Sequence, residues 1–309
     1  MKGDLEGVLP LEFEELGAAH CSRFRIGGVS VEVAGDRDSD VALVPSLLPF
    51  RVEAGVSDIN IQVKWADSLT PRAGRQLFDS GTTWRVYEDE AGFQFDFNSP
   101  VFGKRPYKRL HVDKRFRQAA LHMSEESFAG FPNVAEPLEY PLDELLIMHR
   151  LTQEQAVELH SCGIVSSDGT GNLFVGHSGA GKSTTTRLWT SLEDVEILSD
   201  DRIIVRREHG EIVMYGTPWH GEAAFASPAS APLSRIFILE HGLGNTPVRL
   251  SPSQAVAELF ARSFVPFHRH EYVNSALEFL QDVVNVVPCY RYTFEPDERA
   301  VERILNFHD

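Results

Sequence analysis

Alternating apolar and polar positions dominate the first part of the chain. Short runs with a two-residue period are separated by Gly, Asp, Ser and Pro, which is typical of strands joined by turns. These runs occupy residues 24–33, 59–65, 82–89, 92–98 and 107–116. Residues 117–124 fit either a further strand or a short helix, because their periodicity does not separate the two. The pattern predicts a strand-rich N-terminal domain over residues 1–135.

The pattern changes after a proline-containing segment at residues 130–141. Each proline disfavours helix in the residue before it, so we interpret this segment as a linker. The prolines are Pro132, Pro137 and Pro141. Leu142, Leu145 and Leu146 then recur at helical spacing, directly after a proline that a helix start tolerates. A second domain is therefore predicted over residues 136–309.

Residues 156–176 predict a strand, an Asp-Gly turn and a second strand that leads into a glycine-rich segment. A second hairpin is predicted over 202–216, with its turn at His209 and Gly210. The remaining predicted elements are strands at 195–199, 235–239 and 289–294, and helices that begin at Ser251, His270 and Asp297. Strands and helices are interspersed, so the predicted fold class is mixed α/β.

The length, charge and cysteine content of the chain argue against several classes of protein. A chain of 309 residues with 42% hydrophobic content has room for two domains of about 150 residues each. The formal charge of −16 argues against broad attachment to nucleic acid or to an anionic membrane. Three widely spaced cysteines suggest neither a disulfide framework nor a zinc site. The acidic N-terminal segment lacks a long apolar core, and no stretch approaches a membrane span, so we expect a cytoplasmic protein.

Residues 176–183 read GHSGAGKS, which fits the phosphate-binding loop pattern G-x-x-x-x-G-K-[ST] (Walker A, or P-loop) without a mismatch. An apolar strand precedes this loop and a helical pattern follows it, as the motif requires. The expected nucleotide-binding residues are Gly176, His177, Ser178, Gly179, Ala180, Gly181, Lys182, Ser183 and Thr184. Backbone N–H groups and Lys182 would hold the phosphates of ATP, and Ser183 would bind Mg²⁺. The strand in front of the loop belongs to a hairpin, whereas most such enzymes use a parallel strand.

Two aspartates, Asp200 and Asp201, end the apolar strand that follows the helix of the loop. Phosphoryl transfer needs a carboxylate beside the phosphates to hold Mg²⁺, together with Ser183. The second aspartate could accept the proton of an incoming hydroxyl group if it turns into the site. The alternative is that one of the pair only caps a turn.

Further candidates flank this centre. His160 lies on the predicted strand antiparallel to that of the phosphate loop, where it could tune or relay a proton, although a lone histidine on a strand is more often structural. Residues 216–222 concentrate Trp219, His220 and Glu222 in a loop, and we expect them to line the site. Five arginines are candidates for stabilising transition-state charge, most of them as surface residues otherwise: Arg187, Arg202, Arg206, Arg207 and Arg235.

His160, residues 171–184 (GNLFVGHSGAGKST) and residues 197–201 (ILSDD) together resemble the catalytic domain of HPr serine kinase/phosphorylase, of the phosphoenolpyruvate carboxykinase-like superfamily. The resemblance covers about residues 141–309. It implies an ATP and Mg²⁺ site with catalytic residues His160, Lys182, Asp200 and Asp201, and a homo-oligomer. Residues 203–222 lack the family's Glu-Ile-Arg-Gly signature. The chain therefore looks more like the HPr-kinase-related proteins, whose acceptors vary and include hydroxyl groups on peptides.

The sequence thus predicts an ATP- and Mg²⁺-dependent kinase that phosphorylates a hydroxyl group, most simply a serine of a protein or peptide, with the N-terminal domain selecting the acceptor. Two alternatives stay open. One is a nucleotide-binding regulatory protein without catalysis, against which the aspartate pair speaks. The other is a phosphoenolpyruvate carboxykinase-like small-molecule enzyme, which clustered arginines around a carboxylate pocket would favour.

Overall fold

The computed structural model describes residues 20–70, 75–131 and 136–307. The acidic N-terminal segment and Pro132 of the predicted linker lie outside these ranges. The chain divides into two compact units, which we call the N-terminal unit (Met1–Arg23, Val31–Leu43, Glu53–Leu138) and the C-terminal unit (Phe24–Ser30, Val44–Val52, Glu139–Asp309). Two short segments of the first half thus cluster with the second, which the sequence pattern does not indicate.

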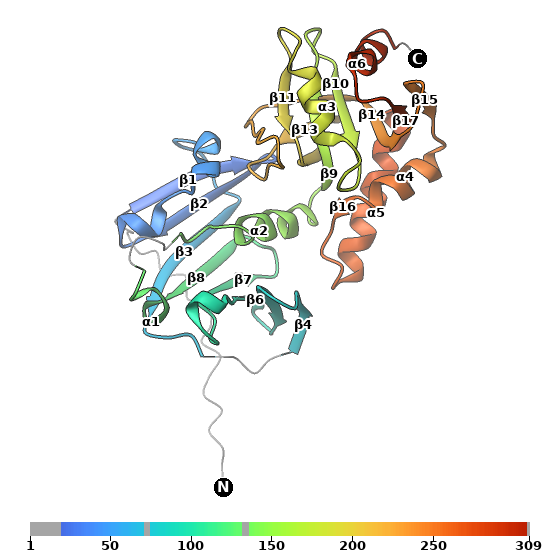
Figure 1. Ribbon diagram of the computed structural model, residues 1–309. Coiled ribbons are helices and arrows are strands. Elements are labelled where there is room, and N and C mark those ends of the chain that lie inside the picture. The colour runs from blue at the N-terminus through green and yellow to red at the C-terminus, as the bar shows by residue number, and fades with distance from the viewer. Residues whose placement is uncertain (1–19, 71–74, 132–135, 308–309) are drawn as a thin grey trace. The chain divides into compact units, whose positions relative to one another are not determined.

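The first sheet has eight strands in the order β1-β2-β3-β8-β7-β6-β5-β4 (Figure 1). Its strands are β1 (His20–Ile26), β2 (Val29–Gly35), β3 (Ile59–Ala66), β4 (Arg75–Asp79), β5 (Trp84–Glu88), β6 (Gly92–Phe97), β7 (Lys108–Asp113) and β8 (Gln118–Ser124). Strand β3 runs parallel to β2 and β8, and β4 to β8 pair antiparallel in meander order. Residues 118–124 are therefore strand, not helix. Four short helical segments accompany the sheet: Asp38–Val41, Pro45–Phe50, Pro100–Phe102 and α1 (Glu125–Phe128).

The second sheet has nine strands in the C-terminal unit. They are β9 (Ala156–Val165), β10 (Gly171–Val175), β11 (Glu196–Ser199), β12 (Arg202–Glu208), β13 (Glu211–Gly216), β14 (Ser230–His241), β15 (Thr246–Arg249), β16 (Ser263–Phe264) and β17 (Cys289–Phe294). The helices are α2 (Leu142–Leu151), α3 (Lys182–Trp189), α4 (Pro252–Phe260), α5 (His270–Val286) and α6 (Glu298–Leu305). The molecule is thus mixed α/β, as predicted, and it contains two large sheets.

Strand β10 leads into the glycine-rich loop, and its residues are buried on both faces of the strand. It pairs antiparallel with β9, as the hairpin prediction requires, and parallel with β14 on its other side. Leu173 and Val175 join the apolar cluster that includes residues of α4 and α5, while Phe174 packs on Trp189 of α3 in the opposite cluster. A run of apolar side chains is required here because neither face of the strand meets water.

The turns of both predicted hairpins have the backbone conformations that their residues favour. Gly169 in the β9–β10 turn has φ +83°, and His209 and Gly210 between β12 and β13 have φ +49° and +90°. Positive φ at both central residues of a two-residue turn fits the right-handed twist of the strands that it joins. Among the described residues, no helix is both long and apolar enough to span a bilayer.

Candidate active site

The glycine-rich loop connects the end of β10 at Val175 to the start of α3 at Lys182. Gly181 precedes the helix with φ +104°, and a Cβ atom there would lie 2.4 Å from Cζ of Phe294. Gly176 has no room either, since its Cβ would lie 2.6 Å from that of Ala180. Both conformation and close packing therefore require glycine in this loop.

The loop and the first turn of α3 present groups suited to phosphate. The N–H groups of Lys182, Ser183 and Thr184 belong to the first turn and have no acceptor within the helix. The side chain of Lys182 is only 6% exposed, and its Nζ donates to the carbonyls of Gly176 and His177 at 3.0 and 3.2 Å. Burial lowers the pKa of Lys182, while the charge of Asp201 opposes this. The lysine thus lies against the loop that it would help to close around an anion.

The two neighbouring aspartates have different environments. Asp200 is fully buried and its carboxylate accepts hydrogen bonds from the loop after β13. Oδ1 accepts from the N–H groups of Gly221 and Phe225 at 2.9 and 3.3 Å, and Oδ2 from that of Ala223 at 2.8 Å. Asp200 therefore holds residues 221–225 in place, which corresponds to the turn-capping alternative raised above.

Asp201 instead faces the phosphate loop. Its Oδ1 lies 2.9 Å from Nε2 of His160 and 3.9 Å from Nζ of Lys182, while Oδ2 accepts a 2.8 Å hydrogen bond from Nη1 of Arg202. Although burial opposes ionisation, the hydrogen bond from His160 and the charges of Arg202 and Lys182 lower the pKa of Asp201. The carboxylate is therefore ionised at neutral pH, and the histidine Nε2–H is the donor.

His160 reaches this position because β9 lies beside the strand of the phosphate loop. Its carbonyl accepts a 3.2 Å hydrogen bond from the N–H of Gly176, the first residue of the loop. On the neighbouring strand β12, Arg202 is the register partner of His160. The ring centroids of His160 and Phe264 lie 5.9 Å apart. The backbone thus fixes His160 relative to the loop on one side and to Asp201 on the other.

The three expected site-lining residues differ in environment. Trp219 is buried, and its Nε1 donates a 2.8 Å hydrogen bond to Oδ2 of Asp143 at the start of α2. His220 and Glu222 are exposed. In the hydrogen bonds and ion pairs of the described ranges, none of the three reaches Lys182 or Asp201. Trp219 therefore anchors its loop to α2, and the other two remain on its surface.

Of the five candidate arginines, Arg202 belongs to the site. Arg206 pairs with Glu154, Arg207 with Asp282, and Arg235 donates to the carbonyl of Phe307. Arg187 is exposed on α3. These partners are spread over separate elements, so the arginine positions give no support to a carboxylate pocket of the phosphoenolpyruvate carboxykinase kind.

Two acidic residues beside Arg202 were missed by the sequence reasoning. Glu144 of α2 and Glu158 of β9 both approach its guanidinium group. The signal was weak but present: Glu158 is a charged residue inside the otherwise apolar run AVELH and shares a strand face with His160, two residues later. A charged residue inside an apolar strand indicates a buried ion pair or a functional group.

Comparisons with known proteins give matches among solved structures, and none among family models or curated protein sequences. Among solved structures, the Hpr(Ser) kinase/phosphatase from Coxiella burnetii aligns with a TM-score of 0.26 and 12% sequence identity, over 48% of this chain and 90% of that one. A TM-score this low does not establish a shared fold.

Proposed function

We propose that the C-terminal unit is an ATP- and Mg²⁺-dependent kinase that transfers the γ-phosphoryl group to a hydroxyl group, specifically a serine of a protein or peptide. The observation that carries the proposal is the convergence of Lys182, His160 and Asp201 at the glycine-rich loop. An ionised carboxylate beside the lysine of a phosphate loop is the arrangement that phosphoryl transfer requires.

The loop fits a triphosphate through its backbone and one cation. The N–H groups at the start of α3 and the ammonium group of Lys182 would bind phosphate oxygens. Mg²⁺ would be held by Ser183 and by the phosphates, because this ion keeps several waters and takes few protein ligands.

Asp201 is the proposed base. It accepts the proton of the acceptor hydroxyl as that oxygen attacks the γ-phosphorus and the bond to the β-phosphate oxygen breaks, so that ADP and a phosphate ester form. His160 donates to Asp201 and orients it. Asp200 is less suited to bind metal directly, because both its oxygens accept backbone N–H groups. We assign it the role of holding the loop of residues 221–225.

The proposal is tested with γ-labelled ATP, Mg²⁺ and a library of serine-containing peptides. Wild-type protein should transfer label, and Lys182→Ala should abolish transfer. Lys104→Ala, at an exposed lysine of the N-terminal unit, is the control and should retain transfer. Binding of a non-hydrolysable ATP analogue by calorimetry distinguishes lost binding from lost chemistry. Transfer by Lys182→Ala at the wild-type rate would reject the assignment.

A further inference from the structure

Arg202 is held on several sides by groups that come from separate elements. Its Nε lies 2.5 Å from Oε1 of Glu144 and 3.3 Å from Oε1 of Glu158, and its Nη1 donates to Asp201. The ring of Phe264 covers one face of the guanidinium plane, with Cζ 4.1 Å from the ring centroid. A planar group that is fixed at its edges and on one face has a single orientation.

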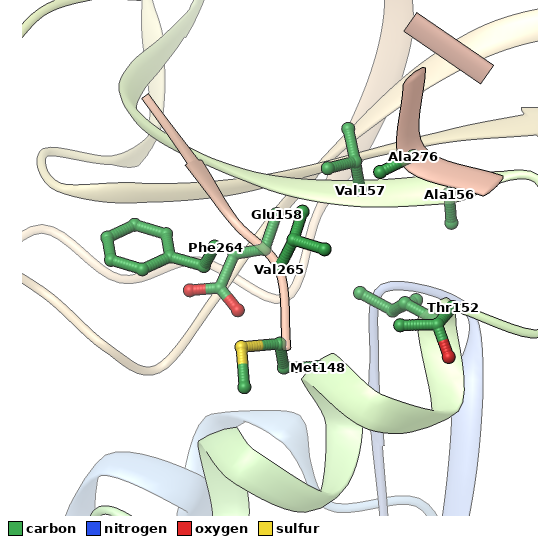
Figure 2. A pocket seen from close by; sticks show the side chains of 9 residues that line it. Met148, Thr152, Ala156, Val157, Glu158, Phe264, Val265 and Ala276 are labelled. Carbon is green, nitrogen blue, oxygen red and sulfur yellow. The ribbon is translucent and has the colours of Figure 1, made fainter. Parts of the chain in front are cut away.

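The residues around Arg202 lie outside the phosphate loop. Glu144 lies in the first turn of α2, and Phe264 lies on β16, where it is the register partner of Glu158 on β9. Figure 2 shows Glu158 and Phe264 among the residues that line one small pocket, with Met148 of α2 below them. Helix α2 and strand β16 therefore help to determine where the guanidinium group lies.

The charges of Arg202 and its acidic neighbours favour a fixed orientation of the Asp201 carboxylate. Burial, with the nearby charge of Glu144, raises the pKa of Glu158 well above its ordinary value, which favours the neutral form of this side chain. Arg202 stays charged, since the acidic neighbours outweigh burial and raise its pKa. The guanidinium group then pairs with the carboxylates of Glu144 and Asp201. The pair with Glu144 fixes the position of the guanidinium group relative to Asp201.

We propose that Arg202 is a positioning residue: held by Glu144 and stacked on Phe264, it fixes the Asp201 carboxylate so that Oδ1 faces His160 and Lys182. The inference deepens the proposed kinase function and rests on it. Helix α2 thereby becomes part of the catalytic geometry although it contributes no group to the reaction.

The first experiment measures the rate of ATP turnover and the affinity for a non-hydrolysable ATP analogue in two variants. Arg202→Lys keeps the charge and removes the planar fork, and Glu144→Gln removes the partner charge without changing size. Each should lower the turnover rate, by about 100-fold and about 10-fold respectively, because displacement by about 1 Å has such effects. Nucleotide affinity should be retained. Arg207→Lys, at the neighbouring arginine that pairs with Asp282, is the matched control.

A double-mutant cycle separates positioning from general structure. If Arg202 acts through Asp201, then Arg202→Lys should cause no further loss of turnover in an Asp201→Asn background. Full additivity of the two losses would overturn the proposal. The proposal would also be overturned if the wild-type protein is active and Arg202→Lys turns over ATP at the same rate as Arg207→Lys. Absence of any turnover by the wild-type protein would reject the kinase function instead, which is a different result.

An NMR measurement on His160 tests the role of Arg202 without requiring enzymatic activity. The ¹⁵N signal of His160 Nε2, assigned with His160→Gln, reports the hydrogen bond to Asp201. It should shift in Arg202→Lys and in Glu144→Gln and stay in place in Arg207→Lys, with circular dichroism to confirm folding. An unchanged His160 signal in both site variants would show that Arg202 does not position Asp201.

Discussion

The two units bury charged side chains in different ways. In the N-terminal unit, Asp96 of β6 and Arg109 of β7 are register partners that form two hydrogen bonds, Nε to Oδ1 at 2.6 Å and Nη2 to Oδ2 at 2.8 Å. Each carboxylate oxygen thus has its own donor within the pair. In the C-terminal unit, Arg202 is shared among Glu144, Glu158 and Asp201.

The difference shows which buried charges indicate function. A bidentate pair inside a sheet satisfies its own charges and can serve structure alone. The cluster around Arg202 instead leaves Oδ1 of Asp201 beside His160 and Lys182, at the phosphate loop. Burial of charge is common to both units. What distinguishes the second is that its neighbours orient one carboxylate toward the glycine-rich loop, where we propose that ATP binds.

The largest contrast should come from removing one charge in each unit. Asp201→Asn should lower the rate of phosphoryl transfer by about 10²–10⁴-fold, since it removes the proposed base. Asp96→Asn, the same change in the N-terminal pair, should lower the melting temperature and leave the transfer rate intact. Both quantities are measured on both variants. Equal transfer rates in the two would remove the functional distinction between the two kinds of buried charge.

The buried pair of Asp96 and Arg109 should contribute strongly to the stability of the N-terminal unit, so loss of one partner should lower that stability. Arg109→Met leaves the buried Asp96 carboxylate with a hydrogen bond from Gln94 but without its cationic partner. It should cost about 3–5 kcal/mol in the free energy of unfolding of the N-terminal unit, measured by urea titration. Arg85→Met is the control, because Arg85 pairs with Asp79 at 2.8 Å with both side chains about one-third exposed. That change should cost under about 1 kcal/mol. Similar losses in both variants would contradict the importance of burial.

The parts of the fold that the sequence predicts well are those governed by local chemistry. The β9–β10 hairpin has an Asp-Gly turn between apolar strands. Helix α4 begins after Ser251, which forms a capping box with Gln254, and Pro252 occupies its first turn. By contrast, β4 (Arg75–Asp79) is mostly exposed and lacks an apolar alternation, so its pairing with β5 gave no pattern to detect.

For the candidate site, the sequence indicates some of the residues that the structure brings together, but not their individual environments. The phosphate loop, His160 and the two aspartates stand out as motifs. That Asp200 binds a loop while Asp201 faces the lysine depends on the N–H groups of Gly221, Ala223 and Phe225, which are distant along the chain. The contact of Glu144 with Arg202 depends on where α2 packs. Tertiary contacts of this kind leave no periodic signal in the sequence.

A smaller effect compares glycines of positive φ in the two units. Gly81 has φ +80° and no atom within 4 Å of the place that a Cβ would take, so Gly81→Ala should cost only the backbone strain, about 1–2 kcal/mol. Gly181→Ala adds a clash with Phe294 and should cost about 1–3 kcal/mol more. It should also weaken binding of the ATP analogue, measured by calorimetry. Equal costs in both variants, with unchanged binding, would mean that the phosphate loop relaxes freely around a new methyl group.

The smallest expected effect is a pH-dependent one at Glu158. Burial raises its pKa in the folded protein above the ordinary value of 4.5, so the stability that it contributes is present below that value and is lost as pH rises through the folded pKa. Glutamine cannot ionise. The melting temperature of Glu158→Gln relative to wild type should therefore increase toward alkaline pH. Glu222→Gln, at an exposed side chain, controls for the loss of one charge. A difference in melting temperature that is constant with pH would mean that Glu158 is ionised in the fold, and that Arg202 is balanced by three carboxylates instead of two.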